Sequence, residues 1–218
     1  LKIDPSTGEA VGLTYAANAE PWAMQPEFAR HDVIDAEGRL VRSVGIPLRA
    51  PCMIHDTAIT SATDGGQGYA LILDLPMTVR PRRLFLNRFP VEYEPTLGGR
   101  IGLLPRTAAS ADAAIFCDVE PCVVLHTVNA HEDRATGLVT LTGLRSLPSD
   151  PSSFIASYTS AFLYEWTLDP KTGQCVSERY LSATPAEFPA IDPRLVGLRA
   201  RYAYAIRPSD ICGPNAYG

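Results

Sequence analysis

Proline and glycine are spread evenly along this chain, and this spacing limits what the chain can fold into more than any other feature. The 218 residues include 19 prolines and 16 glycines. Between these residues lie short runs that are rich in β-branched and aromatic side chains, at the length that is typical of strands. The sequence therefore predicts an all-β protein.

The predicted strands follow one another along the whole chain. They are residues 12–18, 31–35, 39–46, 52–60, 69–75, 100–106, 113–119, 122–130, 138–144, 161–168, 174–181 and 201–207. One segment, residues 152–160, is compatible with a short helical turn instead. No linker divides the chain, so we expect residues 1–218 to belong to one domain.

Turn sequences join several of these strands into hairpins. Asp35–Gly38 and Asp169–Gly173 lie between predicted strands, and the DPxTG pattern of the second also stands at Asp4–Gly8. Aspartate and glycine at such positions are typical of tight turns. Related turns suggest repeated antiparallel units, as in a β-propeller, where a four-stranded sheet recurs about every 40 to 50 residues. A sandwich or an open barrel would give many of the same local signals, so periodicity alone leaves the architecture open.

Composition excludes several classes of protein. A hydrophobic fraction of 46% with 20% charged residues is that of a globular chain. The net charge of -5, with no run of lysine and arginine able to neutralise several phosphates, argues against a nucleic-acid partner. We interpret the one basic cluster, Arg80 to Arg88, as a solvated loop. No apolar stretch approaches the length of a spanning helix, so the sequence predicts a soluble or at most peripheral protein.

The cysteines and the N-terminal residues bear on the compartment. The five cysteines form an odd set without a CxxC pair, which fits neither a disulfide framework nor a zinc ribbon. We interpret them as mostly buried, reduced thiols, and expect a cytoplasmic location. The first residues show neither an initiator methionine nor the order of a secretory signal, so we expect the start of the protein to precede Leu1.

Two histidines and one glutamate are candidates for chemistry. His55 and His126 lie within apolar predicted strands, and Glu187 precedes Phe188 and Pro189. Neutral imidazole suits iron, copper or zinc, and a glutamate can accept the outer N–H of a ligating histidine. Taken singly, each histidine is more often a hydrogen-bonded core residue, and such a glutamate a solvated acid. The residues alone therefore leave both interpretations open.

Other chemistries find little support in the sequence. It has no GxSxG nucleophile elbow, no glycine-rich phosphate loop and no HExxH motif. A nucleophilic pair of Cys52 and His55 is disfavoured, because an odd separation in a strand places the two side chains on opposite faces.

Five segments in order resemble the successive motifs of the carotenoid cleavage oxygenases. This family also includes lignostilbene dioxygenases and the retinoid isomerase of the retinal pigment epithelium. The segments are CMIHDTAIT (52–60), YALILDLPMTV (69–79), LGGRIGLLPR (97–106), FCDVEPCVVLHTVNAHED (116–133) and EFPAIDPRLVGLRARYAYA (187–205). The resemblance runs across nearly the whole chain.

The resemblance implies a seven-bladed β-propeller, truncated here at both ends, whose axis carries an Fe(II) held by four histidines. The histidine of the HD motif maps onto His55 and that of the HxxNA motif onto His126. The glutamate of the EFP motif, which would accept the outer N–H of a ligating histidine, maps onto Glu187. The other two ligands are expected before Leu1 and after Gly218. We therefore expect these 218 residues alone to be poorly active.

The implied reaction is cleavage of a C=C double bond of a carotenoid or apocarotenoid with O₂, giving two carbonyl products. The expected partners are thus an apolar small molecule and O₂, with a peripheral membrane contact as a route to a lipophilic substrate. Two alternatives stay open, a lignostilbene-type dioxygenase acting on phenolic stilbenes and a propeller scaffold without catalysis, while an isomerase is disfavoured. His131 replaces an aromatic residue of the family motif, which we interpret as a packing change, and His31 matches no ligand position.

Overall fold

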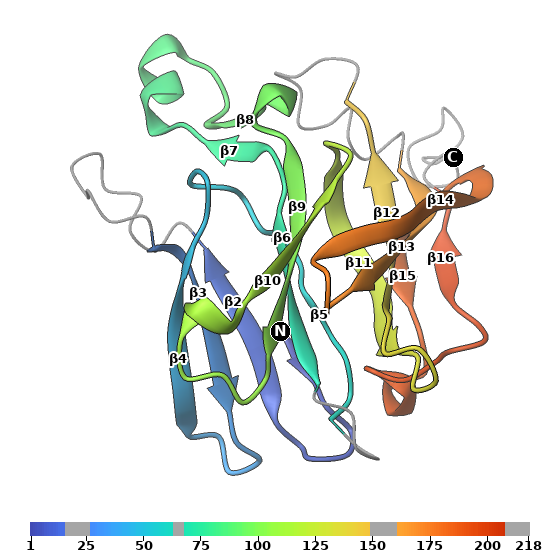
Figure 1. The fold of residues 1–218 in the computed structure, drawn as a ribbon. Coiled ribbons are helices and arrows are strands. Elements are labelled where there is room, and N and C mark those ends of the chain that lie inside the picture. The colour runs from blue at the N-terminus through green and yellow to red at the C-terminus, as the bar shows by residue number, and fades with distance from the viewer. Residues whose placement is uncertain (16–26, 63–67, 149–160, 208–218) are drawn as a thin grey trace, which may run out of the picture.

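The chain is built almost entirely from antiparallel strands (Figure 1). The computed structural model describes residues 1–15, 27–62, 68–148 and 161–207. Within these ranges it forms 16 strands, β1 to β16, and the only helices are short 3-10 segments. The prediction of an all-β protein is confirmed.

The first sheet is a meander of four strands that pair in chain order. The strands are β1 (Lys2–Ile3), β2 (Ala10–Tyr15), β3 (Glu27–Ile34) and β4 (Leu40–Pro47). Each neighbouring pair is antiparallel. This unit therefore closes local hairpins only and needs no long crossover.

The second sheet has eight strands in the order β11-β12-β13-β14-β10-β9-β6-β5. One half consists of β5 (Ala58–Ile59), β6 (Tyr69–Asp74), β9 (Gly99–Pro105) and β10 (Ile115–Val119). The other half consists of β11 (Val123–Glu132), β12 (Val139–Ser146), β13 (Phe162–Asp169) and β14 (Gln174–Pro185). Each half is antiparallel, and the halves meet in a single parallel pair, Asp118 with Gln174. The sheet is thus two four-stranded units placed edge to edge.

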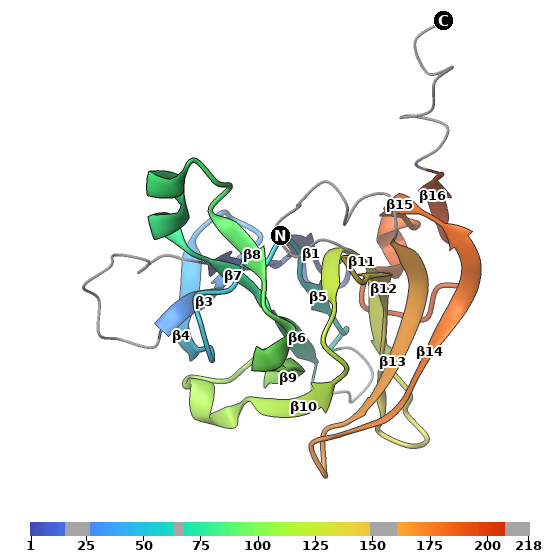
Figure 2. The same cartoon turned by 90° about the horizontal axis from the view of Figure 1, so that it is seen from above.

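Two small hairpins complete the described strands. One joins β7 (Met77–Val79) to β8 (Val91–Tyr93), and the other joins β15 (Glu187–Ala190) to β16 (Tyr204–Ile206). Seen from above, β1, β5 and β11 lie toward the middle of the molecule and the later strands of each unit lie further out (Figure 2). Each unit therefore directs its first strand toward a common centre.

The predicted turns are confirmed, and their chemistry explains the hairpins. The Asp35 carboxylate accepts the backbone N–H groups of Glu37, at 3.1 Å, and Arg39, at 2.8 Å. The backbone N–H of Gly173 donates to the carbonyl of Asp169 at 2.9 Å, with Gly173 at a φ of 69°. A side chain with a Cβ adopts this left-handed region at a cost, so glycine is favoured there.

The core consists of one large cluster of buried apolar residues and two smaller ones. All six residues of β6 are buried, including Asp74 at its end, and Trp166 of β13 is 0% exposed. Fully burying one large aliphatic side chain stabilises a fold by roughly 1.5–3 kcal/mol. A rigid core of this kind supports the segments that meet at the centre.

The predicted strand at 52–60 is mostly wrong. Only Ala58–Ile59 forms β5, while Cys52 makes an isolated bridge to Thr78. Residues 53–57 follow an irregular path, because several of their polar groups bond across to β11 rather than along a ladder. The argument that placed Cys52 and His55 on opposite faces of a strand therefore does not apply, although Cys52 is buried and His55 is exposed.

Sequence reasoning also missed the short strands β1, β7, β8 and β15. Strands of two to four residues carry too few positions for alternation to be visible. The helical turn expected at 152–160 lies outside the described residues.

The basic cluster is not simply a solvated loop. The segment Pro81–Leu86 forms the 3-10 helix η2, in which Arg83 is buried. The Arg83 guanidinium lies 2.7 Å from the Glu92 carboxylate, and Arg80 pairs with Glu94 at 2.6 Å. Buried arginine is tolerated when it is paired in this way, so part of this cluster has a structural role.

Candidate metal centre

His55 and His126 lie side by side although 71 residues separate them in the sequence. Their ring centroids are 4.9 Å apart, and the ring planes stand at 87° to each other. His55 comes from the irregular segment before β5, and His126 comes from β11. Both segments lie toward the common centre of the units, which is why two distant positions meet.

An irregular ladder aims the side chain of His126. The pairing of β11 with β12 shifts register between Val124 and Thr127, and again between Thr127 and Asn129. Such bulges break the strict alternation of a strand and turn individual side chains, often at functional sites. Four residues before His126, from Cys122 to Leu125, are all buried, whereas His126 is only partly so. The bulge thus turns a partly exposed imidazole out of a strand segment that is buried up to Leu125.

The tautomer of His55 follows from its hydrogen bond. Its Nδ1 lies 2.9 Å from the carbonyl oxygen of Leu125. Because a carbonyl can only accept, Nδ1 must carry the hydrogen. In the neutral ring, Nε2 is then the nitrogen with the free lone pair, which is the state that a metal ligand requires.

His126 has the same arrangement with a stronger acceptor. Its Nδ1 lies 2.6 Å from Oε2 of Glu187, the first residue of β15. The side chain of Glu187 is 2% exposed, and that of His126 is 20% exposed. A hydrogen bond to an ionised carboxylate is short and strong. Glu187 therefore fixes the direction of the His126 ring and leaves Nε2 as the lone-pair donor.

Glu187 has further capacity to accept hydrogen bonds. Its Oε1 atom is buried and has no hydrogen-bond partner among the described residues. Its Oε2 atom also accepts the backbone N–H of Phe188 at 3.2 Å. An ionised carboxylate held in so little solvent suits a site in which a positive charge lies nearby. This donor set fits a divalent cation beside His126.

Phe188 completes the surroundings of His126. Its ring centroid lies 5.1 Å from that of His126, and the residue is 51% exposed. Its φ is 52°, a left-handed value that is unusual for a bulky residue and is found preferentially at functional sites. This conformation directs Glu187 inward while the neighbouring ring stays at the surface.

The described residues supply two candidate ligands rather than a complete metal-binding set. The described ranges contain no group of three or more His, Cys, Asp and Glu side chains that could hold a metal. The two imidazoles nevertheless fit Fe(II). Each donates its Nδ1–H to another protein group and leaves Nε2 as a neutral nitrogen donor, which suits that ion. The structure thus brings His55, His126 and Glu187 together. Sequence reasoning did not name Asp56 and Phe188 as site residues, although both lie beside this group.

The other two histidines lie elsewhere. His31 of β3 is 0% exposed, and neither of its ring nitrogens has a hydrogen-bond partner within the described ranges. Burial, followed by the nearby Arg42 guanidinium, lowers the pKa of His31 to about 4. It is therefore a neutral core residue.

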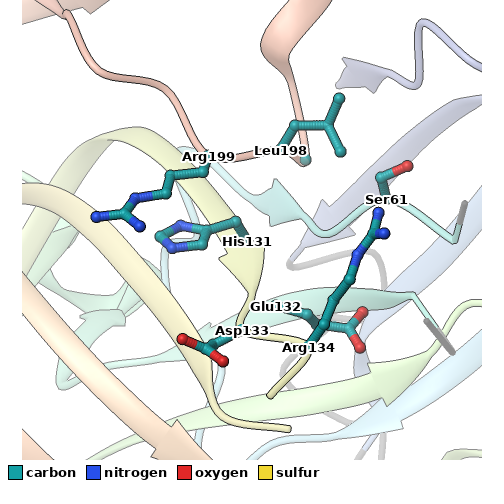
Figure 3. A pocket seen from close by; sticks show the side chains of 8 residues that line it. Ser61, His131, Glu132, Asp133, Arg134, Leu198 and Arg199 are labelled. Carbon is teal, nitrogen blue, oxygen red and sulfur yellow. The ribbon is translucent and has the colours of Figure 1, made fainter. Parts of the chain in front are cut away.

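His131 lines a cavity of about 340 Å³ at the far end of β11, together with Ser61, Arg134 and Arg199. Its ring stands beside the Arg199 side chain (Figure 3). Burial, and then the Arg199 charge, lower the pKa of His131. The half-buried ring is thus held as a neutral group away from His55 and His126.

In the described ranges, no helix has the length and apolar character needed to cross a membrane.

Comparisons with known proteins show the family of the chain. The profile of the retinal pigment epithelial membrane protein family matches residues 1–213. Carotenoid 9,10(9',10')-cleavage dioxygenase 1 of Arabidopsis thaliana is 30% identical over 208 residues, which cover 93% of this chain and 36% of that protein. The carotenoid cleavage oxygenase of Mycobacterium tuberculosis is 25% identical over 261 residues, covering 93% of this chain and 46% of that protein. The chain therefore spans less than half the length of these curated relatives.

Solved structures show the same relationship. The lignostilbene dioxygenase of Pseudomonas brassicacearum superposes with a TM-score of 0.76 at 21% identity, covering 94% of this chain and 42% of that one, which shows a shared fold. The cobalt-substituted apocarotenoid oxygenase of Synechocystis superposes with a TM-score of 0.65 at 26% identity, covering 81% of this chain and 37% of that one. Because the family profile covers nearly every residue, the chain belongs to the retinal pigment epithelial membrane protein family.

Proposed function

We propose that this chain is part of a non-haem Fe(II) dioxygenase that cleaves a C=C double bond of a carotenoid or apocarotenoid with O₂ to give two carbonyl products. The observation that carries the proposal is the pair of imidazoles 4.9 Å apart, each with Nδ1–H bonded to a fixed acceptor and Nε2 left as the lone-pair donor. Relatives with cleavage activity in their names, and a cobalt-substituted one among the solved structures, support it.

The architecture supports a seven-bladed propeller with the metal on its axis. Three four-stranded antiparallel units and the hairpin β15-β16 follow one another around the strands that bear the candidate site. In this proposal, residues 1–218 form part of a single propeller domain. All four histidines of the sequence lie in described ranges, and only His55 and His126 converge. The remaining two ligands of a four-histidine site would therefore come from outside these 218 residues.

Each residue of the site has a distinct task in this reaction. Bound Fe(II) would supply the oxygen chemistry. His55 and His126 hold it with uncharged nitrogen atoms, so that its full charge is retained. Glu187 orients the His126 ring and partly offsets the charge of the site. The exposed Phe188 ring beside His126 offers an apolar surface against which a polyene can pack.

A scaffold without catalysis is less well supported. A propeller that only bound partners would not need the buried Glu187 carboxylate to hold an imidazole at 2.6 Å. Burying a carboxylate costs free energy, which a functional site can offset. The catalytic proposal accounts for this arrangement directly.

We also propose a peripheral contact with a membrane surface. Around η2, four apolar side chains are exposed: Leu84 at 61%, Phe85 at 92%, Leu86 at 68% and Phe89 at 51%. The exposed Arg82 and Arg88 flank them. Aromatic and aliphatic side chains next to arginine suit an interface of lipid headgroups and acyl chains. Such a contact would give access to a lipophilic substrate.

A cytoplasmic location is part of the same proposal. The four cysteines in the described ranges, Cys52, Cys117, Cys122 and Cys175, are all free thiols. Burial raises the pKa of Cys52 to about 12, which keeps it protonated and unreactive.

The test is product analysis with the full-length gene product. Purified protein is supplied with Fe(II), O₂ and, separately, a carotenoid, an apocarotenal and a hydroxystilbene. The proposal expects two carbonyl products from a carotenoid or apocarotenal, and none without O₂. Cleavage of the hydroxystilbene alone would favour the lignostilbene-type alternative. Absence of cleavage with all three substrates would leave the scaffold as the better account.

A further inference from the structure

We infer that Asp56 is a positioning residue that fixes His55 and His126 relative to each other, acting through Thr127. The inference rests on the proposed metal site. Neither Asp56 nor Thr127 would touch the metal or the substrate. Their role would be to hold the two ligand-bearing segments together.

The Asp56 carboxylate is the direct link. Its Oδ2 atom accepts the backbone N–H of Thr127 at 2.9 Å and the Thr127 hydroxyl at 2.8 Å. Its Oδ1 atom accepts the backbone N–H of Thr57 at 2.8 Å, which fixes the plane of the carboxylate. Asp56 directly follows His55, and Thr127 directly follows His126. One carboxylate therefore connects the neighbours of both candidate ligands.

Other bonds complete the connection. His55 Nδ1–H donates to the Leu125 carbonyl at 2.9 Å. The Thr127 hydroxyl also lies 2.9 Å from the Thr57 carbonyl, so its single hydrogen has two acceptors on the same segment. Residues 55–57 and 125–127 are thus joined by side-chain and backbone bonds.

These bonds matter because the regular ladder is absent at this point. Residues 53–57 lie outside any strand, and β11 carries register shifts on both sides of Thr127. At an ordinary strand position, neighbouring ladder bonds would hold the backbone N–H of Thr127. Here the Asp56 carboxylate replaces them. Loss of Asp56 would therefore loosen the two histidines while the rest of β11 stays paired with β12.

Lys2 extends the link to a third segment. Its Nζ lies 3.0 Å from Asp56 Oδ2, and the two side chains are 25% and 14% exposed. Because Lys2 lies on β1 and Thr127 lies on β11, the Asp56 carboxylate contacts the first strands of two units. Asp56 itself lies in the segment that leads into β5, the first strand of a third unit. An ion pair that is partly shielded from water is stronger than one at the surface. Lys2 would thus steady the carboxylate that positions the histidines.

A purely structural ion pair is the competing account, and charge-preserving variants separate the two. Asp56→Glu keeps the charge and the pairing with Lys2 but adds a methylene, so the carboxylate can no longer stand in the same relation to Thr127. Thr127→Val removes the hydroxyl with little change of volume, and Thr127→Ser retains it. Positioning predicts that the first two variants alter the metal site and that the third resembles the unsubstituted protein.

The matched control is Asp74→Glu. Asp74 is also a buried carboxylate, with its side chain 1% exposed and paired with Arg100 at 2.5 Å. Its oxygens accept hydrogen bonds from Arg100, Arg49 and Cys52 rather than from either histidine segment. The variant tests the general effect of lengthening a buried carboxylate while its charge is kept.

The experiment measures Co(II) binding by the full-length protein through competition with a chelator, together with the Co(II) absorption spectrum and the melting temperature. Disturbing groups that orient metal ligands typically weakens binding by about 10- to 100-fold. We expect a loss in that range and a changed spectrum for Asp56→Glu and Thr127→Val, and neither for Asp74→Glu, even if its melting temperature falls.

Three results would contradict the inference, and each does so in a different way. If Asp56→Glu and Thr127→Val bind Co(II) with the affinity and spectrum of the unsubstituted protein, Asp56 has no positioning role and the metal site stands. If the unsubstituted protein binds no Co(II) at all, the proposed metal site fails and the positioning role fails with it. Equal losses in Thr127→Ser and Thr127→Val would also contradict a role for the hydroxyl.

Discussion

The Nδ1 atom of His126 lies 2.6 Å from Oε2 of Glu187, across 61 residues of sequence. The carboxylate is 2% exposed, and its second oxygen has no hydrogen-bond partner in the described ranges. A glutamate in this position would be costly without a nearby positive charge. The pair therefore places a buried carboxylate of β15 against the imidazole of β11, as the proposed metal site requires.

The first prediction concerns this carboxylate. Glu187→Gln keeps an oxygen that can accept from His126 but removes the negative charge, so Fe(II) affinity should fall by about 10- to 100-fold. The measurement is iron retained after dialysis against a graded chelator. Glu165→Gln serves as the control, because Glu165 forms a peripheral pair with Arg179. Equal iron retention in both variants would argue against a role for Glu187 at the metal.

A second prediction separates strain from substrate contact at Phe188. Glycine adopts a φ of 52° without strain, so the melting temperature of Phe188→Gly should stay the same or rise. The free energy of unfolding should increase by at most about 1 kcal/mol. Loss of the apolar ring beside His126 should raise KM for a polyene by about 10-fold. Steady-state kinetics and thermal unfolding measure both effects. An unchanged KM would show that substrate does not pack on this ring.

The third prediction is a pH dependence of stability that originates at His31. In the unfolded chain an ordinary histidine has a pKa near 6.5, whereas burial and the Arg42 charge, opposed in part by Asp32, lower that of His31 to about 4. Between these values only the unfolded chain binds the proton. The contribution of the neutral ring is thus complete above pH 6.5 and is lost as the pH falls toward 4.

The full loss from this one group amounts to about 3 kcal/mol. Urea unfolding at pH 7 and pH 4.5 measures the free energy of unfolding. Between these two pH values, this free energy should fall less in His31→Leu than in the unsubstituted protein. The comparison cancels the titration of carboxylates, which both proteins share. Parallel declines would mean that His31 does not carry the effect.

The fourth prediction tests the apolar surface around η2. Leu84 and Leu40 are both 61% exposed, but only Leu84 lies among the exposed phenylalanines and arginines. Leu84→Ser should therefore weaken binding to vesicles of phosphatidylcholine and phosphatidylglycerol several-fold, and Leu40→Ser should not. Co-flotation at low and high salt measures this. If neither variant changes binding, the surface does not contact membranes.

The sequence predicted the long strands and their turns well, because both depend on local chemistry. Aspartate and glycine specify the turn at 35–38 in any β context, and the apolar run of 69–75 can only be a buried strand or helix segment. The strand predicted at 52–60 was mostly wrong, because the composition of this segment is that of a strand while its polar groups bond to β11. That outcome depends on Thr127 and Leu125, some 70 residues away.

The residues of the candidate site could be named from the sequence, but the contacts that position them could not. His55, His126 and Glu187 were named through resemblance, because single residues at such separations carry no local signal. The register shifts beside Thr127, the left-handed Phe188 and the contacts of Asp56 arise only when the units pack. Asp56 belongs to the HD motif, but the sequence does not indicate that its side chain accepts hydrogen bonds from Thr127 of β11.

The measurement that tests the account most directly is the Fe(II) content of the full-length protein and of His55→Ala, His126→Ala and His131→Ala. His131 is the matched control, because it lies on β11 but lines a separate cavity. The account predicts equimolar Fe(II) in the unsubstituted protein and in His131→Ala, and loss of Fe(II) in the other two variants. Full iron content in His55→Ala or His126→Ala, or none in the unsubstituted protein, would contradict it.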